Sequence, residues 1–166
     1  MAVPQKIYAN ALFAAATGKG RLEVVRDELH AFLEATQDVP QLRELMVNPE
    51  VDPRQKVDAL SAVLADADEL TRNFLLLVAE KGRAPQLNES VREFDVLEFL
   101  VRRAGQVQSK SDILDGVWPH DFEGDPNIVE VYVRRLRCAI DEPFGRRSIE
   151  TVRGAGYRIV DDAVPA

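Results

Sequence analysis

Seven arginines lie within residues 127–158 and face only four acids there, in a chain whose formal net charge is −7. They are Arg134, Arg135, Arg137, Arg146, Arg147, Arg153 and Arg158. A guanidinium group presents a planar fork of donors that fits the edge of guanine, and it also neutralises phosphate. The local excess of three positive charges indicates a surface for a polyanion. The acidic average argues against nonspecific binding of nucleic acid by the whole chain.

The three closest arginines fall in a segment with helical periodicity. Its apolar positions recur at i, i+4, i+7 and i+11, which places them on one face: Val129, Val133, Leu136 and Ile140. The opposite side carries Asn127, Val131, Arg134 and Cys138, with Arg135 and Arg137 flanking it. A helix with an apolar back and arginines in front suits a major groove. An ordinary solvated amphipathic helix has the same pattern, so the arginines alone leave both interpretations open.

A glycine-rich turn follows this predicted helix. Alternating residues on either side of it predict two short strands: Ile149 and Thr151 before the turn, Tyr157 and Ile159 after it. Gly154 and Gly156 permit the tight reversal. Arg153 and Arg158 bracket it, so the hairpin is suited to touch a nucleic-acid backbone beside a groove.

Two helices are predicted ahead of the arginine-bearing helix. Phe94, Leu97, Leu100 and Val101 form the stripe of the first, which Gly105 ends. Residues 109–112 read Ser-Lys-Ser-Asp, a capping-box arrangement that starts the second. The second helix carries Ile113, Leu114, Val117 and Trp118. Three helices and a hairpin in this order predict a winged helix–turn–helix.

Four motifs in residues 92–160 make a resemblance specific. They read Arg-Glu-Phe at 92–94, Val-Trp at 117–118, Val-Glu-Val-Tyr-Val-Arg-Arg-Leu-Arg at 129–137 and Thr-Val-Arg-Gly-Ala-Gly-Tyr-Arg at 151–158. Together they resemble the DNA-binding effector domain of OmpR/PhoB-type response regulators. The resemblance implies a third helix that reads double-stranded DNA, with dimers on direct repeats.

The same resemblance implies which residues meet DNA. On the recognition helix they are Asn127, Tyr132, Arg134, Arg135 and Arg137, and on the wing Thr151, Arg153, Gly154 and Tyr157. Tyr132 stands where histidine is frequent in the family, which changes the chemistry of that contact. Two further departures are expected. No receiver domain with a phosphoacceptor aspartate precedes the module, so a phosphodonor should not change DNA affinity. The small sheet that covers the first helix in the family is also missing.

The first half of the chain shows only helical spacing, with no strand alternation before residue 105. One predicted stripe consists of Leu22, Val25, Leu29, Phe32 and Leu33. Another follows an N-cap at Asp52 and consists of Val57, Leu60, Val63 and Leu64. A third consists of Leu70, Phe74, Leu77 and Val78. Short breaks at glycine and proline separate these segments, which predicts a helical bundle.

The order of three motifs in this half is more specific than their period. They read Tyr-Ala-Asn-Ala-Leu-Phe at 8–13, Leu-Arg-Glu-Leu-Met-Val-Asn-Pro at 42–49 and Leu-Thr-Arg-Asn-Phe-Leu at 70–75, the last running into Glu-Lys-Gly-Arg at 80–83. Residues 3–97 thereby resemble the N-terminal domain of the F-type ATP synthase delta subunit, the oligomycin-sensitivity-conferring protein family. The resemblance implies a six-helix bundle that binds the N-terminal helix of an alpha subunit. The implied groove lies between the first and fifth helices, residues 6–16 and 70–81. Apolar residues of these helices also suit plain core packing.

Several function classes are disfavoured by the sequence. A single cysteine, Cys138, excludes an internal disulfide framework, and neither His30 nor His120 has partners at metal-ligand spacing. No phosphate-binding glycine loop, nucleophile elbow or pair of catalytic acids is present. We therefore expect no enzyme, no cofactor and no metal site. No apolar run is long enough for a membrane span, and the N-terminus lacks a signal-peptide layout, which favours a cytoplasmic protein.

These observations predict a mainly α protein: a helical bundle at residues 1–90 joined to a winged helix at residues 91–166. A helix at about 87–104 is expected to be shared by both. The leading function is nonenzymatic binding of double-stranded DNA, with an alpha-subunit helix as a second partner and possible peripheral placement at the inner membrane face. The alternatives are a stator subunit with an inert tail and a chimera without a native role. Since the covering sheet is missing, Phe94, Leu97 and Leu100 are expected to need the bundle as their cover.

Overall fold

The computed structural model describes residues 4–160, and for residues 4–7 it describes the backbone alone. Residues 1–3 and 161–166 lie outside the described residues. The first of these ranges is the start of the segment that lacks a signal-peptide layout. The described chain has eight α-helices and one antiparallel hairpin, which confirms the predicted fold class. It divides into two compact units, one of residues 11–91 and the other of residues 4–10 with 92–160.

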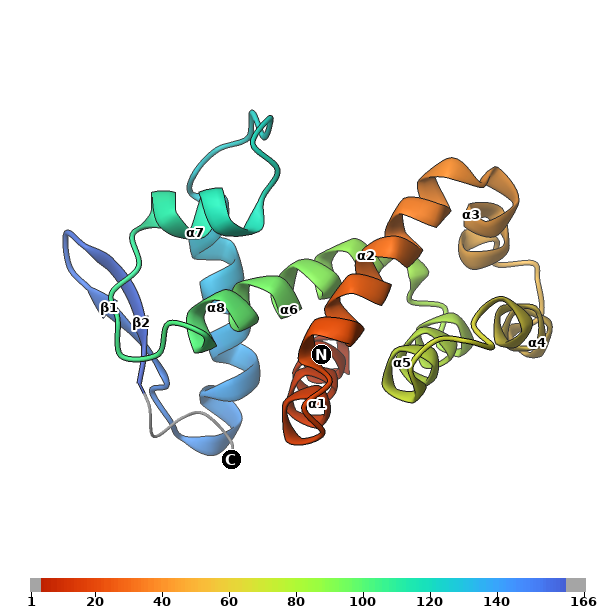
Figure 1. Cartoon of the computed structure of the whole chain (residues 1–166), viewed down its shortest axis with the longest axis horizontal. Helices are drawn as coiled ribbons and strands as arrows, with labels where there is room; N and C mark the ends of the chain where they lie inside the picture. The colour runs from red at the N-terminus through yellow and green to blue at the C-terminus, as the bar shows by residue number, and fades with distance from the viewer. Residues whose placement is uncertain (1–3, 161–166) are drawn as a thin grey trace. The chain divides into compact units, whose positions relative to one another are not determined.

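The first part of the chain is a succession of short helices joined by short loops (Figure 1). They are α1 (Pro4–Gly18), α2 (Leu22–Asp38), α3 (Pro40–Val47), α4 (Pro53–Val63) and α5 (Glu69–Glu80), followed by the 3₁₀ turn η1 (Ala84–Gln86) and α6 (Leu87–Val101). The helices predicted at 6–16 and 70–81 are α1 and α5. The predicted shared helix is α6.

Two aspartates begin helices in the bundle. The side chain of Asp52 accepts a hydrogen bond of 2.8 Å from the Arg54 N–H, directly ahead of Pro53 in the first turn of α4. This confirms the predicted N-cap. Asp68 caps α5 in the same way, accepting from the Leu70 N–H at 2.9 Å. Each cap satisfies a backbone donor that a helix leaves without a partner.

The core of the residue 11–91 unit lies where α2 packs on α3 and α5, and where α4 packs on α5. Burial of each large apolar side chain there stabilises the fold by about 1.5–3 kcal/mol. The buried side chains of α2, α4 and α5 include Val25, Leu29, Phe32, Leu60, Phe74, Leu75 and Val78. All of these except Leu75 belong to the predicted stripes, whereas the predicted Leu70 and Leu77 are half-buried.

One predicted core position in α4 is wrong. Val63 is 61 % exposed, whereas Lys56 is only 5 % exposed. The Lys56 ammonium donates to the backbone carbonyl of Met46 at 3.3 Å, which gives the buried charge a polar partner. The buried face of α4 is therefore rotated from the purely apolar stripe.

The unit of residues 4–10 and 92–160, called the winged unit below, contains two helices after α6 and the hairpin. These are α7 (Lys110–Val117), α8 (Ile128–Ile140), the 3₁₀ turn η2 (Glu142–Phe144), β1 (Ile149–Val152) and β2 (Gly156–Ile159). The strands pair antiparallel, with Ile149 opposite Ile159 and Thr151 opposite Tyr157. Ser109 and Asp112 form the predicted capping box at the start of α7. The buried side chains Val129, Val133 and Leu136 confirm the apolar face of α8.

A third stretch of chain extends the hairpin beyond what the sequence predicted. Gln108 and Tyr157 exchange two backbone hydrogen bonds of 2.8 Å, and Gly105 donates to the Ile159 carbonyl at 2.9 Å. β2 is thus bonded on both sides. The backbone of β2 lies so close to residue 108 that a Cβ on Gly156 would be 2.0 Å from the carbonyl oxygen of Gln108. Gly156, at φ +145°, is therefore required by contact as well as by backbone conformation.

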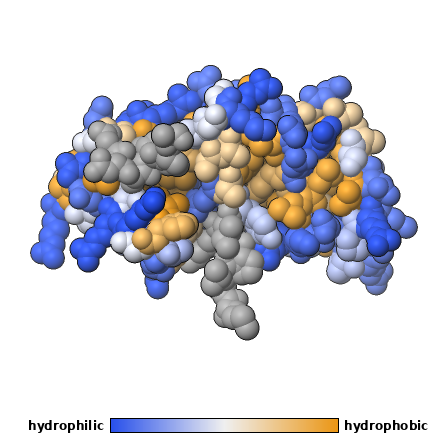
Figure 2. Space-filling view, turned by 90° about the horizontal axis from the view of Figure 1, so that it is seen from below, coloured by the Kyte–Doolittle hydropathy of each residue, from blue (hydrophilic) through white to orange (hydrophobic). Residues whose placement is uncertain are grey.

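Hydrophilic and hydrophobic residues alternate in patches on the face drawn in Figure 2. The large apolar residues with substantial exposure are Val24, Val39, Val47, Val63, Val107, Val131 and Phe144. None of the helices in residues 4–160 combines the length and apolar character needed to cross a membrane.

Candidate nucleic-acid interface

Arg134 presents an available guanidinium on α8. Its side chain is exposed, and within residues 4–160 it makes no hydrogen bond or ion pair. Val131, one turn earlier, is 44 % exposed although it is apolar. A basic group beside a methyl-bearing surface on one exposed helix face matches what base edges offer in a major groove.

Arg135 is held by the protein itself. Its Nη1 lies 3.7 Å from Oε1 of Glu93 on α6, and its guanidinium carbon lies 5.3 Å from the centre of the Tyr132 ring. Glu93 is buried, and a buried carboxylate needs a nearby positive charge to offset its loss of hydration. Arg135 therefore links α8 to α6, with part of its charge neutralised.

Arg137 is joined to the wing. Its Nε and Nη2 donate to the backbone carbonyl of Ile149 at 3.0 and 2.7 Å, and Nη2 also donates to Oγ1 of Thr151 at 2.8 Å. Two residues that the sequence predicts as separate DNA contacts are thus bonded to each other. The bonds tie the last turn of α8 to strand β1.

Asn127 lies at the exposed start of α8, next to an ion pair. The Lys110 ammonium of α7 donates to Oδ1 of Asn127 at 3.3 Å and pairs with the carboxylate of Glu130. The hydrogen bond with Glu130 raises the pKa of Lys110 above its ordinary value. The Asn127 carboxamide oxygen is therefore engaged, while its amide N–H₂ group remains a donor.

The two tyrosines predicted as DNA contacts are core residues. Tyr132 is 9 % exposed, and its ring packs edge-on against Trp118 with centroids 5.5 Å apart. Tyr157 is 7 % exposed, and its backbone is bonded to Gln108. Little of either ring is exposed, so a DNA contact by these residues stays a prediction that would involve little ring surface. Tyr132 lies three residues after Val129, so the helical period itself assigns it to the buried face.

The wing tip keeps the exposure that the sequence predicted. Arg153 and Gly154 are exposed, and Arg153 makes no hydrogen bond or ion pair within the described residues. Gly154 has φ +74°, a left-handed conformation that glycine adopts without strain. Arg158, in contrast, pairs across the hairpin with Glu150, Nη2 to Oε2, at 2.6 Å. Of the two wing arginines, Arg153 is the one without an ion-pair partner in the part of the chain that the structure describes.

Three residues with roles at this surface were missed by sequence reasoning. Lys110 pairs with Glu130, Glu93 pairs with Arg135, and Asp141 is a buried acceptor at the end of α8. The spacing of Asp141, four residues after Arg137, was the available signal, since it puts both on one side of the helix. The other two partners lie on distant helices, and no local pattern reveals them.

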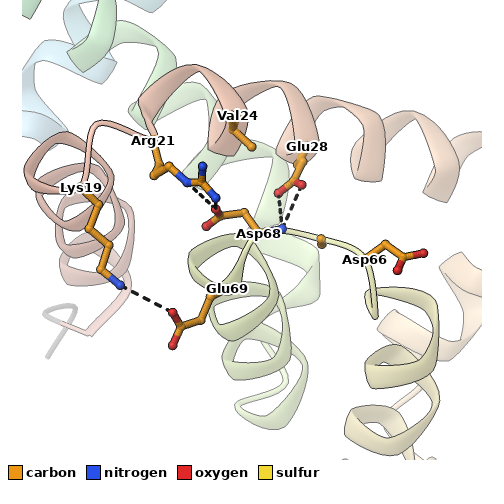
Figure 3. A pocket seen from close by; sticks show the side chains of 8 residues that line it. Lys19, Arg21, Val24, Glu28, Asp66, Asp68 and Glu69 are labelled. Carbon is orange, nitrogen blue, oxygen red and sulfur yellow. Dashed lines mark hydrogen bonds and ion pairs between the residues drawn. The ribbon is translucent and has the colours of Figure 1, made fainter.

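The bundle contains an open pocket of about 670 Å³ at the starts of α2 and α5 (Figure 3). Arg21 pairs with Asp68 at 2.9 Å, and Lys19 lies 3.6 Å from Glu69. Both oxygens of the Glu28 carboxylate accept from the Asp68 N–H, at 2.9 and 3.0 Å. These charges mainly satisfy one another and the start of α5, so the pocket has the character of a structural ion-pair network.

Two family descriptions match the chain. Residues 5–109 match "ATP synthase delta (OSCP) subunit", and residues 84–159 match "Transcriptional regulatory protein, C terminal". Both cover residues 84–109, which include α6. The two resemblances stated from the sequence are confirmed.

Relatives of known name support the second match. The chain is 47 % identical over 77 residues to the transcriptional regulatory protein TcrA of Mycobacterium tuberculosis, covering 46 % of this chain and 30 % of that protein. It is 41 % identical over 111 residues to the phosphate regulon transcriptional regulatory protein PhoB of Rhizobium meliloti, covering 64 % of this chain and 46 % of that protein. The chain thus spans less than half the length of these relatives. The chain belongs to the ATP synthase delta (OSCP) subunit family, whose description matches residues 5–109, and its residues 84–159 are similar to the C-terminal part of transcriptional regulatory proteins.

Proposed function

We propose that this chain is a nonenzymatic binding protein whose winged unit binds double-stranded DNA. The observation that carries the proposal is the exposure of two arginines, Arg134 on α8 and Arg153 on the wing, that have no ion-pair partner within residues 4–160. In this proposal Arg134 reads a guanine edge in the major groove, and Arg153 contacts phosphate beside it. Gene regulation by the named relatives supports the same role, which would be carried out in the cytoplasm.

The remaining predicted site residues take different parts in the proposal. Asn127 and Arg135 lie at the edge of the contact surface, where each keeps donors for DNA despite its intramolecular partner. Thr151 and Gly154 contribute a hydroxyl and a backbone N–H to phosphate. Tyr132 and Tyr157 support the surface from the core. Two copies on direct-repeat DNA give the expected dimer.

The test is enrichment of a random duplex library on the full chain, followed by gel shift with the enriched sequence. Enrichment of a direct repeat, bound more tightly than a shuffled duplex, is the expected result. Loss of that preference in Arg134→Ala would support the assigned surface. Equal binding of enriched and shuffled duplexes, or no binding at all, would contradict the proposal.

A second binding function is proposed for the bundle, on the basis of the match over residues 5–109. Helix α5 keeps three half-buried leucines, Leu70, Leu76 and Leu77, with apolar surface available to a partner. An amphipathic helix could bind such a surface through apolar anchors one turn apart. The proposed partner is the N-terminal helix of an ATP synthase alpha subunit.

A pull-down with a peptide of that alpha-subunit helix tests the second function. Retention of the full chain by the peptide, weakened by Leu77→Asp and unaffected by Arg134→Ala, is the expected result. A chain that binds DNA and ignores the peptide would retain only the first function. A chain that binds the peptide and ignores DNA would instead support the stator alternative with an inert tail.

A further inference from the structure

The outer edge of strand β1 is covered by side chains of α8. In the hairpin, Tyr157 and Ile159 direct their backbone groups away from β1, toward residues 105–108. Their partners Thr151 and Ile149 must then direct theirs to the opposite side, the free edge of the sheet. An uncovered edge of this kind is open to pairing with other chains and to shifts of register.

Two side chains, one in the last turn of α8 and one at its C-cap, satisfy the backbone groups of this edge at Ile149. The Arg137 fork donates to the Ile149 carbonyl at 3.0 and 2.7 Å. The Asp141 carboxylate, 4 % exposed, accepts from the Ser148 N–H at 2.7 Å and more weakly from the Ile149 N–H at 3.4 Å. Arg137 and Asp141, one helical turn apart, thus bond the carbonyl and the N–H of Ile149, respectively.

Other contacts at the same end of α8 reinforce this attachment. The Arg137 guanidinium lies 5.8 Å from the ring centre of Tyr157, which is in β2. The backbone carbonyl of Asp141 accepts from the Arg146 N–H at 2.9 Å and closes the loop between α8 and β1. The helix is therefore hydrogen-bonded to β1 and to the entry loop, and it contacts β2 through the Tyr157 ring.

We propose that Arg137 and Asp141 form a brace that fixes the wing relative to α8, and that Arg137 serves DNA binding by positioning the wing. This inference rests on the proposed DNA-binding function. DNA contact by Arg134 on the helix and Arg153 on the wing requires a fixed separation between those two elements. A wing held in place before binding loses less conformational freedom on DNA, which strengthens the complex.

Arg137→Lys distinguishes the loss of the brace from the loss of a positive charge. Lysine keeps the positive charge for phosphate but lacks the planar fork that bonds Ile149 and Thr151 together. Asp141→Asn keeps the size of the side chain and removes the charge that strengthens its bonds to backbone N–H groups. Arg54→Ala is the control, because Arg54 is exposed in α4, outside the arginine-rich residues 127–158, and its side chain makes no hydrogen bond or ion pair within residues 4–160.

The experiment measures the affinity of the full chain for its enriched duplex. Each variant is measured as a single substitution and again in combination with Arg153→Ala. Arg137→Lys and Asp141→Asn should each weaken binding about tenfold, and adding Arg153→Ala to either should cause little further loss, because the wing is no longer held against DNA. In the Arg54→Ala background, Arg153→Ala should keep its full effect. Full binding by Arg137→Lys, with the Arg153 effect unchanged, would overturn the brace.

Amide hydrogen exchange tests the brace without DNA. Asp141→Asn and Arg137→Lys should speed exchange at Ser148 and Ile149, while the Tyr157 amide, bonded to Gln108, stays protected. Unchanged protection at Ile149 in both variants would overturn the brace. If Asp141→Asn does not fold, Arg137→Lys carries both measurements. If the parent chain binds no DNA, the proposed function fails, and the exchange result still decides on the brace.

Discussion

The guanidinium of Arg137 donates two hydrogen bonds to the backbone carbonyl of Ile149. A residue that sequence reasoning assigns to DNA is therefore first a link between the recognition helix and the wing. Arg134, three residues earlier, makes no such link within the described chain. This difference separates Arg135 and Arg137, which bond to other parts of the winged unit, from Arg134, which has no such partner within residues 4–160.

Arg134→Ala should relax base preference. Loss of a bidentate contact to guanine costs roughly 1–3 kcal/mol and removes discrimination at one base pair. Competition gel shifts against duplexes substituted at single positions measure this effect. Arg54→Ala, an exposed arginine of α4, is the control and should behave as the parent chain. Unchanged discrimination in Arg134→Ala would remove this residue from the reading surface.

Arg153→Ala should weaken all duplexes alike. A wing arginine on phosphate contributes affinity without sequence information, and its loss should reduce the salt slope by about 1. Affinities for the enriched and the shuffled duplex, each at several salt concentrations, provide the check. A loss confined to the enriched duplex would mean that Arg153 reads bases instead.

Gly156→Ala should destabilise the winged unit. The added Cβ would overlap the Gln108 carbonyl oxygen, a backbone atom that cannot move aside, at an already unfavourable φ of +145°. We expect a loss of at least about 2 kcal/mol in the free energy of unfolding, measured by urea denaturation. Gly18→Ala has open space and should stay within about 1 kcal/mol of the parent. Equal stability of the two variants would contradict the close approach of β2 to residue 108.

Local sequence patterns predicted the elements well because their causes are local. The capping box at Ser109 and Asp112 and the glycine turn of the wing depend on residues a few positions apart. The contacts that local patterns did not predict are between residues far apart in the sequence. The bonding of Gln108 to Tyr157 and the pairing of Arg135 with Glu93 join residues about 40 or more positions apart. Tyr132 differs from these, because the resemblance implies a DNA contact for it while its position three residues after Val129 places it on the buried face of α8.

Acid should weaken the start of α7. Hydrogen bonds from the Ser109 hydroxyl and backbone N–H hold the pKa of Asp112 below its ordinary value. A lowered folded-state pKa means that the stabilisation is complete above the unfolded pKa, near 3.9, and is lost as pH falls through the folded value. NMR titration of the Asp112 carboxyl checks the direction. A midpoint at or above the unfolded value would contradict it, and Asp112→Asn should abolish this part of the pH dependence of stability.

A fragment of residues 90–166 should be unstable or aggregate. It retains Phe94, Leu97 and Leu100, which are 1 %, 5 % and 1 % exposed in the full chain, but it lacks residues 4–10 of the same compact unit. Burial of three such side chains contributes on the order of 5–8 kcal/mol. Thermal melting followed by near-ultraviolet circular dichroism compares the fragment with the full chain, which should unfold as one cooperative unit. A sharp transition of the fragment at an unchanged midpoint would show that it needs nothing from the preceding residues.

The salt dependence of DNA affinity tests the central claim most directly. If exposed cationic groups of α8 and the wing neutralise about four to six phosphates, the logarithm of affinity should fall against the logarithm of salt concentration with a slope of about −4 to −5. Fluorescence anisotropy of the full chain with its enriched duplex gives this slope, and Arg134→Ala combined with Arg153→Ala should make it shallower. A flat salt response, or a slope that the double variant leaves unchanged, would contradict DNA binding through this surface.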